Sequence, residues 1–172
     1  MNIKFTNTQE AHCFQLLKES NCQSVLNIGF RKGSREQIKD ALAEIGCSFS
    51  IVEVFEPFYK KIKSVQGVKD LFNINVKDIK KLGLVWDGII WLHGPEHLAW
   101  EDFLSVRKEI EDCCNKIVIY QAPIGHCPQG ELEGNPYEKH LSTLTPDMFN
   151  ELGYQTKYPL ETTFSAWKIF NK

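Results

Sequence analysis

Short apolar runs alternate along the chain with stretches in which apolar residues recur every three or four positions. Five runs have the length and composition of β-strands, at 25–28, 49–55, 71–76, 85–92 and 116–120. The stretches between them have helical periodicity, most clearly over 34–45, where Gly46 follows as a C-cap. Repeated strand–helix units predict an α/β fold with a parallel, doubly wound sheet.

The two ends of the chain depart from this alternation. Near the start, Asn7 and Glu10 form a pair typical of a capped helix N-terminus, so a first helix is predicted before the first strand. Near the end, two predicted strands, 154–158 and 164–170, follow each other with no helix between them. We therefore expect these two strands to be antiparallel.

Composition indicates an ordinary globular protein. The chain has 172 residues, 42% of them hydrophobic and 24% charged, with a net charge of −2. These values predict one domain over 1–172, with a helical segment over 1–22 and a core over 23–172, and give no support for nucleic acid or membrane as a partner. The start of the chain has no apolar signal-like segment, so we expect a cytoplasmic protein whose six cysteines are reduced thiols.

In a doubly wound sheet, ligands bind at the carboxyl ends of the strands beside the first one. The first strand ends in 25-VLNIGFRKGS-34, where Gly29 and Gly33 allow a ligand to approach the backbone. Glu53 lies about twenty residues further on, where a carboxylate can accept both ribose hydroxyl protons of a nucleoside cofactor. An ordinary glycine turn and a glutamate at the surface edge are the alternatives.

The ends of the third and fourth predicted strands carry further polar residues. Asp78, in 76-VKDIKKL-82, fits a ligand contact and a helix N-cap equally well. In 91-WLHGPEHL-98, His93, Glu96 and His97 match the H-x-x-E-H pattern of some zinc proteases. We reject that interpretation because Gly-Pro marks a strand-to-helix turn, whereas the motif needs one continuous helix. Glu96 is then a first-turn acid favoured by the helix dipole, and no metal is expected.

The stretch 121–149 follows the fifth predicted strand. Most of it is a polar loop, which leads into a short helix over 146–152. It is rich in proline, glycine, histidine and aromatic residues. Long loops of this kind are often functional lids, and an ordered surface loop is the alternative.

The order of these segments resembles the class I S-adenosylmethionine-dependent methyltransferases from Ser24 to the end of the chain. The first glycine segment is similar to the family's V-L-D-x-G-x-G-x-G motif, and VEVFEP is similar to the acidic end of its second strand. WDGIIWLHGPEHL is similar to its fourth-strand segment. The stretch APIGHCPQGELEGNPYEKHLSTLTPDMFNELGY most resembles a bacterial and archaeal subgroup with a G-N-P-Y-x-x-H segment.

The resemblance implies a Rossmann-like fold with a mostly parallel seven-stranded sheet, helices on both faces, and S-adenosylmethionine as cofactor. The implied cofactor-binding residues are Gly29, Phe30, Arg31, Gly33, Glu53, Val54, Asp78, Ile79, His93 and Gly94. The implied acceptor-site residues are His126, Asn135, Tyr137 and His140. Candidate bases are His97 and His140, for which a hydrogen-bonded structural histidine is the alternative. The acceptor is expected to be a small molecule or a glycan.

Three residues depart from the family pattern, namely Asn27, Arg31 and His93. Arg31 stands where the middle glycine is usual, so it either fills the methionine pocket or pairs with the cofactor's carboxylate. A second hypothesis is therefore a binding protein that kept the fold and lost turnover. A third is a nicotinamide-dependent oxidoreductase, whose G-x-G-x-x-G motif would need glycines where this chain has Arg31 and Ser34.

Overall fold

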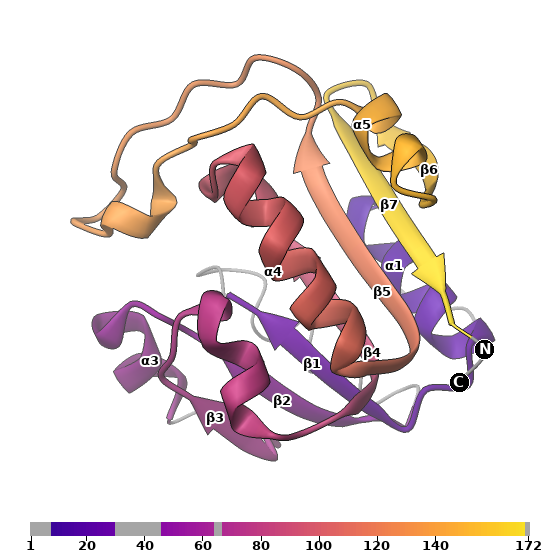
Figure 1. Cartoon of the computed structure of the whole chain (residues 1–172). Coiled ribbons are helices and arrows are strands. Elements are labelled where there is room, and N and C mark those ends of the chain that lie inside the picture. The colour runs from indigo at the N-terminus through magenta and orange to yellow at the C-terminus, as the bar shows by residue number, and fades with distance from the viewer. Residues whose placement is uncertain (1–7, 30–45, 64–66, 171–172) are drawn as a thin grey trace.

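The computed structural model of the chain describes residues 8–29, 46–63 and 67–170 (Figure 1). The predicted helix over 34–45 and the capping residue Asn7 lie outside the described residues. None of the described helices is both long enough and apolar enough to cross a membrane.

The described strands form one seven-stranded sheet in the order β3-β2-β1-β4-β5-β7-β6. The strands are β1 (Ser24–Ile28), β2 (Ser48–Val52), β3 (Asp70–Phe72), β4 (Trp86–Leu92), β5 (Cys114–Pro123), β6 (Gln155–Leu160) and β7 (Thr163–Ile169). The helices are α1 (Thr8–Glu19), α3 (Glu56–Ile62), α4 (Trp100–Asp112) and α5 (Pro146–Glu151), with 3₁₀ turns η1 (Val76–Leu82), η2 (Pro95–His97) and η3 (Pro136–Glu138). The first five strands are parallel, and β7 is antiparallel to both β5 and β6. The predicted fold class is confirmed.

Several element boundaries differ from those predicted. β2 ends at Val52, so Glu53 follows the strand instead of lying within it. β3 has three residues because it is an edge strand that pairs only with β2, and the chain then turns into η1. Pro95 begins the separate turn η2, whereas the long helix α4 begins at Trp100. β5 is longer than predicted because its end pairs with β7 as far as Pro123.

Helices lie against both faces of the sheet (Figure 1). On one face, Phe103 and Ile110 of α4 pack with Tyr120 and Phe149 in a cluster that excludes water. On the other face, Phe14 of α1 belongs to a second buried cluster. Burial on both faces explains why the central strands read as continuous apolar runs.

The segment between β5 and α5 crosses the carboxyl-terminal edge of the sheet and carries η3 at its far end (Figure 1). Its two ends are tied by a bridge between Gly125 and Leu144, where the Gly125 N–H donates to the Leu144 carbonyl at 2.7 Å. The segment therefore covers the place where a doubly wound sheet binds its ligands.

Candidate functional site

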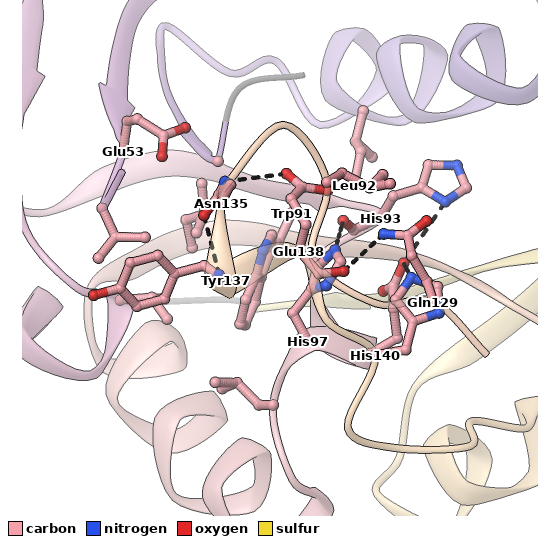
Figure 2. A pocket seen from close by; sticks show the side chains of 18 of the residues that line it. Glu53, Trp91, Leu92, His93, His97, Gln129, Asn135, Tyr137, Glu138 and His140 are labelled. Atoms are coloured by element: carbon pink, nitrogen blue, oxygen red, sulfur yellow. Dashed lines mark hydrogen bonds and ion pairs between the residues drawn. The ribbon is translucent and has the colours of Figure 1, made fainter. Parts of the chain in front are cut away.

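A cavity of about 370 Å³ lies at the carboxyl ends of β1, β2 and β4. This volume is within the usual range for small-molecule sites, roughly 300–1,000 Å³. Its walls come from the three strand ends, the start of η1, and the segment between β5 and α5. Figure 2 shows Glu53 on one side, His97 and His140 on the other, and Asn135 between them.

The end of β1 contributes Ile28 and Gly29 to the cavity wall. Gly29 has φ = 71°, in the left-handed region that favours glycine, and its N–H donates to the Val52 carbonyl at 2.8 Å. The buried Asn27 carboxamide donates to the Gly29 carbonyl, so this departure from the family motif holds the turn in place. Phe30, Arg31 and Gly33 lie outside the described residues.

Glu53 brings a carboxylate to the cavity wall directly after β2. The residue is only 4% exposed, and its Oε1 accepts a hydrogen bond from the Phe55 N–H at 2.8 Å. The Asn73 amide donates to the Glu53 carbonyl at 2.8 Å, which fixes the backbone at this point. Val54, one of the cofactor-binding residues that the family resemblance implied, also lines the cavity, and its contact with the adenine stays a prediction.

In η1, different residues face the cavity from those that the sequence indicated. Asn75 and Val76 line it, whereas Ile79 is fully buried in the core. The Asp78 carboxylate is paired with Lys81 at 2.7 Å, and Asp78 is not part of the cavity lining. The N-cap of η1 is Asn75, so the N-cap alternative for Asp78 is wrong. An adenine contact for Asp78 and Ile79 stays a prediction.

The end of β4 has an unusual backbone. His93 has φ = 51°, a left-handed conformation that is uncommon for a residue with a side chain, and its N–H donates to the Gln121 carbonyl at 2.8 Å. At Gly94, an added β-carbon would overlap the Trp91 indole ring. Such strain persists where the surrounding structure imposes it and is concentrated at functional sites.

The 3₁₀ turn η2 brings Glu96 and His97 to the cavity. Glu96 is a first-turn acid, as predicted, but it belongs to the short turn η2, because the long helix α4 starts only at Trp100. Glu96 is buried, with 2% exposure. Glu96 Oε1 lies 3.8 Å from His93 Nδ1 and 4.0 Å from His140 Nε2. Burial lowers the pKa of His97, an effect that the Glu138 charge partly opposes.

The segment after β5 supplies most of the predicted acceptor residues. Asn135 is buried, and its side chain accepts a hydrogen bond from the Tyr137 N–H at 3.0 Å. Asn135, Tyr137 and His140 all line the cavity. His126 is exposed and lies outside the lining, so its predicted contact with the acceptor lacks support from the geometry.

Sequence reasoning missed several residues of the cavity wall. They include Asn75, Trp91, Gln129, Leu132, Glu138 and Thr163. Gln129 and Glu138 lie in the segment already singled out as a lid, and the Gln129 amide donates to the Glu138 carbonyl at 2.7 Å. Thr163 begins β7, and its place beside the cavity follows from the antiparallel pairing with Pro123.

No protein family model and no curated protein matches the chain. Solved structures match it in fold. The methyltransferase domain of bacterial CtHen1-CN has a TM-score of 0.68 at 16% identity, with 98% of this chain and 100% of that chain covered. The plantazolicin methyltransferase BpumL, in complex with a pentazolic desmethylPZN analog and SAH, has a TM-score of 0.71 at 11% identity, with 98% and 87% covered.

Human N-acetylserotonin methyltransferase in complex with SAM gives a TM-score of 0.66 at 11% identity, with 95% of this chain and 53% of that chain covered. The strand order, the antiparallel final strands and these matches agree. The chain therefore has the Rossmann-like fold found in S-adenosylmethionine-dependent methyltransferases.

Proposed function

We propose that this protein is an S-adenosylmethionine-dependent methyltransferase acting on a small-molecule or glycan acceptor. One observation carries the proposal. The buried carboxylate of Glu53 and the histidine-bearing segment around His140 line one and the same cavity. A nucleoside cofactor and an acceptor could therefore be held beside each other at the carboxyl edge of the sheet.

The residues of the described wall fit the cofactor's parts. The Glu53 carboxylate would accept hydrogen bonds from the ribose hydroxyls, and Val54, Ile74 and Val76 give an apolar surface for the adenine. Among the described residues other than its chain neighbours, none lies within 4 Å of a β-carbon added at Gly29. When bound, the cofactor supplies an electrophilic methyl group on a sulfonium.

The chain's own contribution is to position the acceptor and exclude water. His93 and Gly94 would lie beside the reacting methyl, and Asn135 and Tyr137 would hold the acceptor from the covering segment. An acceptor that must lose a proton needs a base at this end of the cavity. His97 and His140 both line the cavity there and are our candidates for that role.

Calorimetric titration of ligand-free protein with S-adenosylmethionine and S-adenosylhomocysteine tests the proposal. Binding of both at micromolar strength, with no heat from NAD at the same concentrations, is the expected result. Failure of both to bind would overturn it and favour the alternative of a noncatalytic binding protein. In that case the Arg31→Gly variant should bind, since that alternative makes Arg31 the obstacle.

One structural finding weakens this alternative. Asn27, one of the two departures that motivate it, does not line the cavity and instead holds the Gly29 carbonyl. Having Asn27 in place of the family's aspartate therefore does not take a cofactor-binding group away from the described cavity wall. Arg31 alone carries the alternative.

A further inference from the structure

Three side chains at the acceptor end of the cavity have the geometry of a metal-binding group. Among the described residues, the carboxylate of Glu96 and one ring nitrogen each of His97 and His140 lie within 4.8 Å of one another. Ligand atoms lie about 2.0–2.2 Å from a zinc ion, so two ligands of one tetrahedral site are roughly 3.4 Å apart. Small side-chain rotations would close the group around an ion.

Hydrogen bonds to backbone carbonyls orient both histidine rings, as is common for histidines that bind metals. In His140, Nδ1 lies against the Cys127 carbonyl, which selects the tautomer whose Nε2 lone pair faces Glu96 Oε1 at 4.0 Å. In His97, Nε2 and Nδ1 lie 3.1 Å and 3.3 Å from the carbonyls of His93 and Lys139. A neutral imidazole has only one N–H to donate, so the other nitrogen keeps its lone pair, and a small rotation of the ring would turn it from the carbonyl toward a cation.

Backbone hydrogen bonds hold the segment that carries His140 against η2, which carries Glu96 and His97. The Leu141 and Ser142 N–H groups both donate to the Glu96 carbonyl, at 2.8 Å and 3.2 Å. The His140 N–H donates to the Gln129 carbonyl at 3.0 Å. The Glu96 side chain is 2% exposed and the His140 side chain 9% exposed, so these two groups are shielded from water before any ligand arrives.

From this arrangement we infer that Glu96, His97 and His140 form a binding site for one divalent transition-metal cation. Two imidazoles and one carboxylate suit Zn²⁺, Mn²⁺ or Co²⁺ better than Mg²⁺, which prefers oxygen ligands alone. Three protein ligands leave a further coordination position, and all three residues line the cavity. The sequence alone predicted no metal, because the H-x-x-E-H motif needs both of its histidines on one helix. The tertiary structure instead supplies His140 from the covering segment.

The site also narrows the class of acceptor, a step that rests on the proposed function. A cation with an open position in the cavity attracts an oxygen ligand and makes a hydroxyl easier to deprotonate. Acceptors with a hydroxyl group are therefore favoured. The two histidines would then serve as ligands and not as bases, and the proton of the metal-bound hydroxyl would pass to water at the open side of the cavity. Methyl transfer would be lost with a chelator and restored by the cation.

Metal-free protein titrated with Co²⁺ and Mn²⁺ tests the site without reference to activity. We expect one equivalent to bind, with a Co²⁺ absorption spectrum that lacks the intense thiolate bands of cysteine ligation. Glu96→Gln and His140→Ala should each weaken binding at least tenfold. The matched controls Glu101→Gln and His126→Ala, both at exposed residues, should leave it unchanged.

Thiolate bands, or equal binding by Glu96→Gln and wild type, would overturn the inference. If a variant does not fold, Mn²⁺ magnetic resonance on the wild-type protein decides, because nitrogen couplings from imidazole must be present. Titration of metal-free protein with S-adenosylhomocysteine separates the two proposals. Cofactor binding without cation binding refutes the metal site alone, and cation binding without cofactor binding refutes the methyltransferase alone.

Discussion

The Trp91 indole ring occupies the space that a side chain on Gly94 would need. Trp91 is itself buried and packs against Phe103 and Tyr120, with ring centroids 6.4 Å and 6.3 Å away. The strained turn at the end of β4 is thereby coupled to the core beneath the cavity. A change at either residue should affect both stability and the shape of the site.

Gly94→Ala should destabilise the protein by about 1–3 kcal/mol, because a methyl group would force the Trp91 ring out of its packed position. Chemical denaturation monitored by tryptophan fluorescence measures this loss. The matched control is Gly130→Ala, where an added β-carbon meets nothing within 4 Å. Its effect should stay within roughly 0.5 kcal/mol. Equal stability of the two variants would contradict the observed packing.

Glu53→Gln should weaken binding of S-adenosylhomocysteine about 10–100-fold, since a charge-assisted hydrogen bond contributes roughly 1.5–3 kcal/mol. The amide can still accept the Phe55 N–H, so the local turn should persist. Calorimetry measures the affinity. Glu56→Gln is the control, because Glu56 is exposed and pairs with Lys60 at 2.8 Å outside the cavity. An unchanged affinity in Glu53→Gln would remove the ribose contact from the proposal.

Stability in acid should depend on Asp87. Burial alone would raise the pKa of its carboxyl, but hydrogen bonds from the Gln23 N–H and the Lys116 ammonium, at 2.8 Å and 3.1 Å, outweigh burial and lower the pKa. A carboxyl with a depressed pKa in the folded state stabilises above its unfolded-state pKa, about 3.9. That stabilisation is lost as the pH falls through the lower folded-state pKa.

Asp87→Asn should therefore lose about 1–3 kcal/mol at neutral pH, and its stability should fall less steeply below pH ~4 than that of the wild type. Urea denaturation across that pH range measures both effects. Asp112→Asn removes an exposed ion pair to Lys80 and should cost less than about 1 kcal/mol. Parallel acid profiles for Asp87→Asn and wild type would refute the prediction.

Thiol reactivity should distinguish Cys127 from Cys22. Burial, followed by the Cys47 and Asp87 charges, raises the pKa of Cys22 to about 12, so its thiolate is scarce at pH 8. Cys127 is exposed on the segment that covers the cavity. Iodoacetamide at pH 8 should label Cys127 first, and Cys22 only after unfolding. Peptide mass mapping would detect the opposite order, and Cys127→Ser should abolish the early label.

The amino-acid sequence by itself determined the order of the described strands, because apolar periodicity reflects the faces that a strand or helix must bury. It also marked two strand ends that line the cavity, since a glycine at 29 and a carboxylate at 53 are features that can be read locally from the sequence. Boundaries were less well determined. β3 ends after three residues because an edge strand has a single partner, which no local pattern encodes.

Only the tertiary structure decided which distant residues meet. Glu96 and His140 face each other because backbone hydrogen bonds join η2 to the segment after β5, and the sequence carries no signal for that pairing. Likewise, Asn75 lines the cavity, whereas the Asp78 carboxylate pairs with Lys81 and lies outside the lining. Side-chain direction depends on backbone geometry and neighbouring segments. Periodicity reveals which face is buried, and three-dimensional contacts reveal which chemistry is assembled there.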